Sequence, residues 1–219
     1  THVIEPIELP EQSKVDKFLP PYHHPLPLDP EKPVTIGAFG PPSIYTEVKW
    51  AQEIALESAK NVILECWREF GKAFGRYYSP VESYHSEGAK VLLLTMGSYS
   101  ETAMVAIDKM RSEDKAVGLL KLRLWRPFPF DELRQAVKDA KVLIVLDRAI
   151  SFGGPGGPVF SEVKSALYNE AERPKVIGFV GGLGGREISM SGFEEMVNQG
   201  IKIAQAGSKR EFEIFGVRE

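Results

Sequence analysis

Apolar runs and stripes divide the chain into an irregular first part and a strictly alternating second part. From Ala89 onward, short apolar runs of the kind found in buried strands alternate with amphipathic segments of about ten residues. The first run, residues 91–96, is followed by the small-residue turn Gly97-Ser98 and by a segment for which Ser100 or Thr102 would be the N-cap. Such alternation predicts βαβ units and therefore an α/β fold, an open, mainly parallel sheet flanked by helices.

The same pattern sets the bounds of each predicted element. The predicted strands cover residues 91–96, 116–124, 142–146 and 176–180, with a last edge strand over 212–217. The predicted helices cover residues 103–111, 131–140, 159–168 and 193–206.

The part before Ala89 predicts a different organisation. Residues 1–33 hold eight of the 16 prolines, so we expect an extended arm with room for one short helical turn within 10–19. A short strand is predicted over 34–39, and then a long helix, capped by Ser43, that runs to about Phe74. The predicted divisions are a Pro-rich arm or linker from a truncated upstream domain (1–33), a connecting strand and long helix (34–88), and an α/β domain (89–219).

The end of the long helix carries one cysteine and several aromatic residues. Phe70, Phe74, Tyr77 and Tyr78 favour packing against another subunit or domain over stacking on a cofactor. Cys66 is the single cysteine, so the chain has no internal disulfide and cannot ligate an iron–sulfur cluster or a Cys-rich zinc site by itself. Its place in a helical pattern predicts a buried structural thiol rather than a nucleophile.

Composition and charge exclude two classes of partner. The net charge is −3 and the charged residues are interspersed, with no basic stripe for nucleic acid and no polybasic patch for a membrane surface. No apolar run approaches the roughly 20 residues that span a bilayer. A single thiol fits a reducing compartment. We therefore predict a cytoplasmic protein without nucleic-acid or membrane partners.

Candidate binding residues follow the predicted strands, at the edge where open parallel sheets bind ligands. Gly97 and Ser98 follow the first strand, Arg126 the second, and Arg148 and Gly153 the third. The Arg126 fork would contact a carboxylate or phosphate, or pair with an acidic residue across an interface. The Gly-rich loop around Gly153 would cradle phosphate with backbone N–H groups, although it has neither P-loop nor dinucleotide-binding spacing.

Sets of residues typical of catalysis are missing from the sequence. There is no Ser–His–Asp set, no paired histidine at metal spacing and no evident general base, so no catalytic or metal-binding residue is predicted. From the residues alone, the chain is an α/β domain whose loops bind an anion or a partner at one sheet edge.

Four longer strings carry a family resemblance. They are TMGSYSETAMVAIDKMR, KAVGLLKLRLWRPFP, VLIVLDRAISFGGPGGPVFSEVKSAL and FVGGLGGREIS. Together with the opening segment and WREFGKAFGRYYSPVESY, they resemble the alpha subunit of the 2-oxoacid:ferredoxin oxidoreductases, the pyruvate:ferredoxin enzymes above all. The resemblance covers essentially the whole chain and places residues 89–207 in a transketolase C-terminal-like domain.

The resemblance implies a function for the complete enzyme. Such enzymes decarboxylate a 2-oxoacid, here pyruvate by first expectation, on thiamine diphosphate with magnesium, pass electrons through [4Fe–4S] clusters to ferredoxin, and transfer the acyl group to coenzyme A. The expected partners are the beta, gamma and delta subunits and, through the complex, ferredoxin. This chain alone would bind no cofactor, be inactive and serve as a structural and interface element.

Two hypotheses therefore remain for the sheet edge. In the first, Gly97, Ser98, Arg126, Arg148 and Gly153 line one face that meets a partner domain near the cofactor or the coenzyme A path. In the second, the chain is an independent α/β module whose Gly-rich loops bind a phosphate-bearing ligand.

Overall fold

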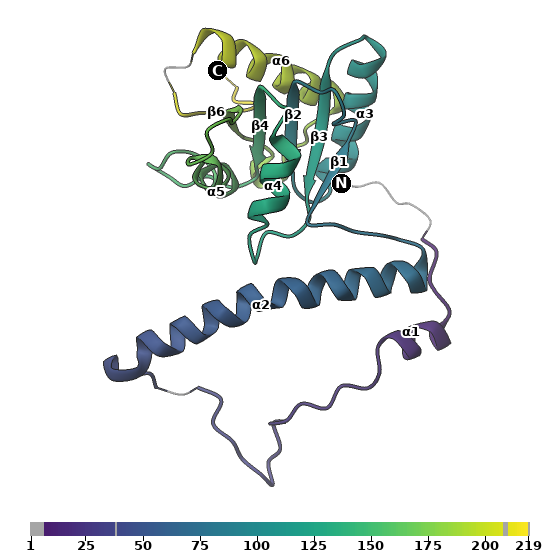
Figure 1. Ribbon diagram of the computed structural model, residues 1–219, viewed down its shortest axis with the longest axis vertical. Helices are drawn as coiled ribbons and strands as arrows, with labels where there is room; N and C mark the ends of the chain where they lie inside the picture. The colour runs from purple at the N-terminus through teal and green to yellow at the C-terminus, as the bar shows by residue number, and fades with distance from the viewer. Residues whose placement is uncertain (1–6, 38, 208–209, 219) are drawn as a thin grey trace. The chain divides into compact units, whose positions relative to one another are not determined.

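The chain folds as two compact units. The computed structural model describes residues 7–37, 39–207 and 210–218. The division falls between Tyr78 and Ser79. Figure 1 follows the chain through both units, from the purple N-terminal segment to the yellow C-terminal helix.

The second unit is built on one sheet. Within the described residues its strands are β1 (Val81–Tyr84), β2 (Val91–Thr95), β3 (Val117–Leu122), β4 (Val142–Asp147), β5 (Lys175–Val180) and β6 (Phe212–Ile214). Their order across the sheet is β1-β3-β2-β4-β5-β6 (Figure 1). Every neighbouring pair is parallel except β1 and β3, which are antiparallel.

This topology confirms the predicted α/β fold with an open, mainly parallel sheet. The predicted edge strand is present as β6, although it ends at Ile214 rather than Val217. The sequence analysis missed β1, the opposite edge strand. Its four residues, VESY, carry no apolar run, and only pairing with β3 makes them a strand.

Helices cover both faces of the sheet. They are α3 (Tyr99–Ser112), α4 (Phe130–Val137), α5 (Pro158–Leu167) and α6 (Met190–Ala206), with a 3₁₀ turn η1 (Leu183–Gly185) before α6. Alternate residues of β2 point to opposite faces, as the pleat requires. Leu93 packs in the core with Phe193 of α6, whereas Leu92 packs in the other core with Leu133 of α4 and Phe160 of α5. Burial on both faces explains why the strands read as continuous apolar runs.

The start of α3 differs from the prediction. The helix begins at Tyr99, with Ser98 at the N-cap and no hydrogen bond from its side chain, so neither Ser100 nor Thr102 is the cap. The reason is the burial of Ser100. Its Oγ lies 2.9 Å from the buried Thr95 Oγ1, and this bond satisfies a hydroxyl that would otherwise be buried without a partner.

The first unit holds the predicted short and long helices, α1 (Gln12–Phe18) and α2 (Pro42–Phe74). The prediction that Ser43 caps α2 is wrong: Pro41 is the N-cap and Pro42 the first helical residue. Proline is well suited to that position because its φ is already helical and it has no N–H to leave unpaired. Gly75, in the left-handed region at φ 73°, ends the helix.

Two further predictions for the first unit are wrong. Residues 34–37 and 39 form no strand, and Ala38 lies outside the described residues. Among the described residues of this unit no strand is available to pair with that segment, and Pro33 and Pro41 bound it closely. Cys66 is exposed rather than buried, and among the described residues of its unit only α1 packs on α2, near the Phe70 and Phe74 end.

The aromatic residues at the end of α2 pack within the first unit. The Phe18 ring of α1 makes edge contacts with Phe70 and Phe74, at centroid distances of 5.7 and 5.4 Å. Tyr78 lies 5.9 Å from Phe70. The cluster therefore joins α1 to α2, and the sequence pattern could not name Phe18 as its fourth member.

Candidate functional site

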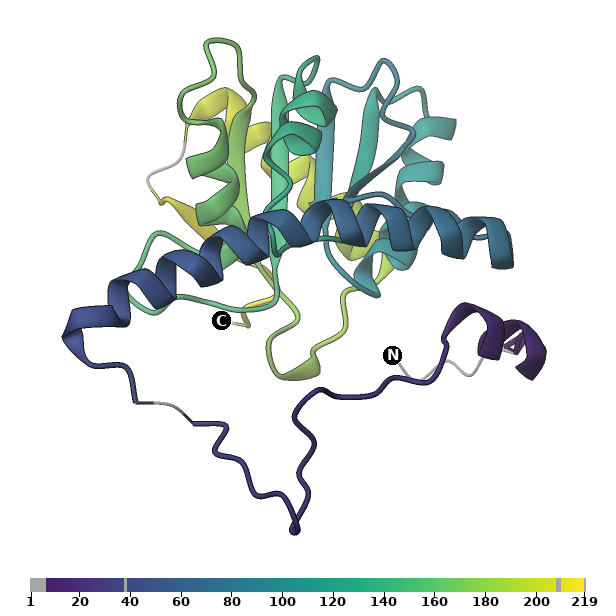
Figure 2. The ribbon, with the colours of Figure 1, turned by 60° about the horizontal axis from the view of Figure 1, so that its bottom comes forward.

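The carboxyl ends of the parallel strands form the candidate site. Because β2 to β6 run in one direction, the loops that leave β2, β3, β4 and β5 share one edge of the sheet (Figure 2). All five residues predicted as binding or interface candidates lie in these loops. One cluster around Tyr99 holds Gly97, Ser98 and Arg148, and a second around Glu162 holds Arg126. Gly153 lies at the tip of the loop between β4 and α5.

Tyr99 joins three of the loops. It is the first residue of α3, and its ring packs in the core beside Phe193, at a centroid distance of 5.9 Å. Its hydroxyl donates to the backbone carbonyl of Arg186, 3.1 Å away, in the loop after β5. Gly182 packs so closely that a Cβ there would lie 2.0 Å from the tyrosine Oη. A side chain at position 182 is therefore excluded sterically.

Arg148 lies over the same tyrosine from the loop after β4. Its Cζ is 4.7 Å from the centroid of the Tyr99 ring, a cation–π geometry. Within the described part of the chain, this guanidinium has no hydrogen bond and no ion pair, and the residue is exposed. The ring fixes the position of a positive charge that no carboxylate of the described chain neutralises.

Arg126 has a different environment on the other face of the sheet. Its two terminal nitrogens donate to the Glu162 carboxylate of α5 at 2.7 and 2.6 Å, while its Cζ lies 4.8 Å from the Trp125 ring centroid. The Trp125 Nε1 donates to the same carboxylate at 2.7 Å. The hydrogen bonds from Arg126, helped by that from Trp125, lower the pKa of Glu162. Arg126 thus pairs with an acidic residue of its own domain.

A buried carboxylate supports the Gly-rich loop between β4 and α5. Asp147, the last residue of β4, accepts from the backbone N–H groups of Val159 and Phe160, each at 2.9 Å. Burial raises the pKa of Asp147, while these two backbone bonds act to lower it. A Cβ at Gly157 would lie 2.1 Å from the carboxyl carbon, so glycine is required there. The carboxylate therefore occupies the anion position at the start of α5.

The tip of the same loop is closed by its own backbone. Ser151 N donates to the Gly156 carbonyl at 3.0 Å, and Gly154 N donates to the Ser151 carbonyl at 2.9 Å. Gly153, one of the predicted candidates, takes the left-handed φ of 72° that this turn requires. The turn leaves Phe152 with 91% of its surface exposed.

The remaining predicted candidates lie at the turn after β2. Gly97 and Ser98 are both exposed, and Gly97 has a φ of 71° with open space around its Cβ position. Through Tyr99 the structure brings this turn together with Arg148. It does not bring Arg126 to them, because Arg126 reaches α5 on the opposite face of the sheet.

The residues that organise these clusters were not predicted from the sequence. Tyr99 lies in the string TMGSYSETAMVAIDKMR, but nothing in its spacing shows that it meets Gly182 and Arg186, more than 80 positions away. Asp147 gave one usable signal, since an acidic residue that ends a buried strand must find donors. Glu162 gave none, because a glutamate on an amphipathic helix ordinarily faces solvent.

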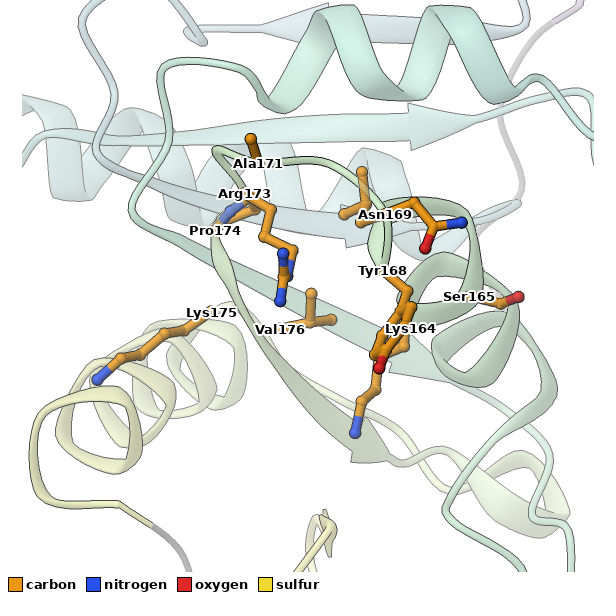
Figure 3. A pocket seen from close by; sticks show the side chains of 10 residues that line it. Lys164, Ser165, Tyr168, Asn169, Ala171, Arg173, Pro174, Lys175 and Val176 are labelled. Carbon is orange, nitrogen blue, oxygen red and sulfur yellow. The ribbon is translucent and has the colours of Figure 1, made fainter.

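A separate hollow of about 780 Å³ opens at the opposite, amino edge of β5. Figure 3 shows Lys164, Tyr168 and Arg173 beside it, and Lys175 extending toward α6. Arg173 donates to the Glu170 carbonyl at 2.6 Å, and Lys175 donates to the Ala204 carbonyl of α6 at 2.8 Å. Cations that bind carbonyls at or beyond helix C-termini stabilise those ends. Two of the cations that line this hollow therefore have a structural role in the fold.

In the part of the chain that the structure describes, no three His, Cys, Asp or Glu side chains gather in a way that could hold a metal ion. Across the same residues, no helix combines the length and apolarity that crossing a membrane requires.

Comparison with protein families gives a match on the sheet unit. Residues 89–193 match the family model described as pyruvate:ferredoxin oxidoreductase core domain II. This range runs from just before β2 into α6 and includes both arginine clusters and the Gly-rich loop. Among solved structures, the chain is similar at a TM-score of 0.45 and 16% identity to a split gene transketolase, over 59% of this chain and 44% of the other.

Curated relatives extend the match over nearly the whole chain. The pyruvate synthase subunit PorA of Methanothermobacter thermautotrophicus is 42% identical over 91% of this chain and 51% of its own length. That of Pyrococcus furiosus is 40% identical over 94% and 52%. The ketoisovalerate oxidoreductase subunit VorA of Pyrococcus abyssi is 37% identical over 94% and 53%. The chain spans about half the length of these relatives.

Proposed function

The chain carries core domain II of the pyruvate:ferredoxin oxidoreductase family, and from that premise we propose that it is part of the alpha subunit of a 2-oxoacid:ferredoxin oxidoreductase. The complete enzyme would catalyse the coenzyme A-dependent oxidative decarboxylation of a 2-oxoacid to acyl-CoA and CO₂, with reduction of ferredoxin. The observation that carries the proposal is the 42% identity to a pyruvate synthase subunit over 91% of the chain.

The residues of this chain do not fit the cofactors of such an enzyme. A [4Fe–4S] cluster takes four cysteine thiolates, and the chain has one cysteine. The described residues also offer no group of acidic or histidine side chains for a magnesium ion. The clusters would therefore be held outside this chain, and we propose the same for thiamine diphosphate and magnesium, in the beta, gamma and delta subunits or in other parts of the alpha subunit. This domain would be inactive alone.

The alternative, an independent module that binds phosphate with its Gly-rich loop, has less support. The Asp147 carboxylate already accepts from the N–H groups of Val159 and Phe160 at the start of α5. Ser151 N and Gly154 N, at the loop tip, donate to carbonyls of the same loop. A phosphate at this helix end would have to displace a buried carboxylate and overcome its charge.

The loops at the carboxyl ends of the parallel strands are better explained as an interface. Gly97, Ser98, Arg148 and Gly153 are exposed in loops at that edge, and Arg126 pairs with Glu162 on the other face of the sheet. We propose that these loops meet a partner domain near the cofactor or the coenzyme A path in the complete enzyme. A cytoplasmic location is the matching prediction for the complex.

The relatives of this chain are named for more than one 2-oxoacid substrate. Relatives named for pyruvate and for ketoisovalerate match this chain at 42% and 37% identity. We propose pyruvate as the first substrate to test, because the two pyruvate synthase subunits named above are 42% and 40% identical to this chain.

The test is purification of the complete protein from its source under anaerobic conditions, with mass spectrometry and iron analysis of what co-purifies. We expect subunits that contain iron and thiamine diphosphate, and reduction of ferredoxin that depends on both coenzyme A and pyruvate. 2-Ketoisovalerate and 2-oxoglutarate serve as comparison substrates. A protein that purifies without iron or thiamine diphosphate and binds coenzyme A or a nucleotide tightly would overturn the proposal in favour of the ligand-binding module.

A further inference from the structure

We infer that the loop over residues 148–157 is a preformed anchor for a partner protein whose surface offers an apolar pocket with a carboxylate at its rim. Phe152 would enter the pocket and Arg148 would pair with the carboxylate. The inference rests on the proposed function only for the identity of the partner, which would be another subunit or domain of the oxidoreductase.

The exposure of Phe152 is built into the loop. Single exposed apolar residues are common on protein surfaces and need no explanation by themselves. Phe152, however, is 91% exposed at the tip of a turn that two backbone hydrogen bonds close and that Gly153 makes possible through its positive φ. The turn holds the ring out in solvent in a fixed backbone conformation.

The base of the loop is fixed as well. Asp147 binds both Val159 N and Phe160 N, and Gly157 packs directly against its carboxyl group. A loop held in this way loses little conformational entropy when a partner binds, which raises affinity for a given contact area.

Arg148 supplies the polar half of the anchor. Tyr99 fixes the guanidinium by stacking at 4.7 Å but leaves its charge uncompensated, since no described residue forms an ion pair with it. A planar fork that is already oriented makes a strong two-bond contact with a carboxylate. The aromatic and arginine side chains of the loop are the types that dominate binding energy at protein interfaces.

A protein partner fits these features better than a small anion does. Four backbone N–H groups of the loop and of the start of α5 already have acceptors within the fold, those of Ser151, Gly154, Val159 and Phe160. Phe152 offers a small anion nothing, whereas an apolar pocket on a protein would bury its ring.

The experiment measures the affinity between the complete alpha subunit and its partner subunits, with Phe152→Ala and Arg148→Glu as test variants. Tyr168→Ala and Arg173→Glu are matched controls, because Arg173 lies 5.9 Å from the exposed Tyr168 ring at the opposite sheet edge. Arg148→Gln serves as a milder second variant, and circular dichroism melting checks that every variant folds.

We expect each test variant to raise the dissociation constant by at least about tenfold and each control by less than about twofold. Wild-type affinity in folded Phe152→Ala, Arg148→Glu and Arg148→Gln subunits would overturn the inference. So would an equal loss in the control variants. A wild-type complex that oxidises pyruvate while the test variants assemble normally would refute the anchor and leave the proposed function standing.

Discussion

Arg126 follows β3 and Arg148 follows β4, the strands on either side of β2, and both side chains stack on an aromatic ring, at 4.8 and 4.7 Å. They differ in what else they contact. Glu162 binds the Arg126 fork from α5, whereas Arg148 meets no carboxylate in the described chain. An arginine stacked on an aromatic ring thus forms an ion pair within the domain at position 126, whereas at position 148 it is an exposed charge held in place by the ring.

The difference lies in the segment beside each arginine, a helix for Arg126 and a loop for Arg148. Glu162 lies on α5, and its carboxylate reaches both Arg126 and the Trp125 indole. Beside Arg148, the loop after β5 contributes Gly182 and the backbone carbonyl of Arg186, which binds the Tyr99 hydroxyl rather than the arginine. Stacking on a ring holds a guanidinium in place, and a nearby carboxylate decides whether the guanidinium forms an ion pair within the domain.

The largest effect on stability should come from a side chain at Gly182, which would displace the Tyr99 ring that lies under Arg148. Gly182→Ala places a Cβ 2.0 Å from the Tyr99 Oη and adds left-handed strain at φ 70°. We expect a loss of about 3–5 kcal/mol in the free energy of unfolding. The control is Gly184→Ala, at φ 63° with open space around the Cβ, which should cost about 1–2 kcal/mol. Chemical denaturation of both variants measures the difference, and equal losses would contradict the packing role of Tyr99.

A smaller effect should follow from removal of the carboxylate under the loop. Asp147→Ala leaves the N–H groups of Val159 and Phe160 without their buried acceptor, and we expect a loss of about 2–3 kcal/mol. Asp147→Asn keeps one acceptor oxygen and should lose about half as much. Urea unfolding at pH 7 gives both values. Similar stability of the Ala variant and the wild type would mean that water replaces the carboxylate.

Asp147 should also give a pH signature. Burial raises its pKa above the unfolded value of about 3.9, so the native state holds this proton more tightly than the unfolded state. Relative to Asp147→Asn, the wild type should therefore lose stability as the pH rises from about 4 through the native pKa, and then stay level. Thermal melting from pH 3.5 to 7 tests this, and a difference that grows in favour of the wild type over that range would contradict it.

The ion pair of Arg126 should contribute little to stability. The two side chains are 50% and 34% exposed, so solvent weakens the pair. A double-mutant cycle of Arg126→Ala and Glu162→Ala should give a coupling of about 0.5–1 kcal/mol at pH 7. Because the pair lowers the pKa of Glu162, the coupling is present above the unfolded pKa of about 4.3 and is lost as the pH falls through the native value.

Arg148→Ala should change stability by less than about 0.5 kcal/mol, and a larger loss would remove the contrast between the two arginines.

The sheet could be predicted from the sequence because its signal is local. Each buried strand is an apolar run, and each crossover helix has its own stripe, so β2 to β6 and α3 to α6 were found without knowledge of their neighbours. Elements that depend on a distant partner were not found. β1 is a strand only because β3 lies beside it, whereas the described part of the first unit offers residues 34–37 no strand to pair with.

The sequence could predict where the candidate site lies in the fold but not which side chains contact one another there. Parallel topology put the five candidate residues at one sheet edge, as the fold confirms. The partners of the two arginines were out of reach, since Glu162 is 36 positions from Arg126 and Tyr99 lies in the loop of another strand. Long-range contacts of single side chains leave no period in a sequence.

One measurement tests directly whether the two arginines face inward and outward as described. Phenylglyoxal labelling of arginine, read by peptide mass spectrometry, should be carried out on the chain alone and on the complete complex. We expect Arg148 to react several times faster than Arg126 in the chain alone and to become protected in the complex, while the rate at Arg126 stays the same. Equal rates in the chain alone, or an Arg148 that remains reactive in the assembled complex, would contradict this account.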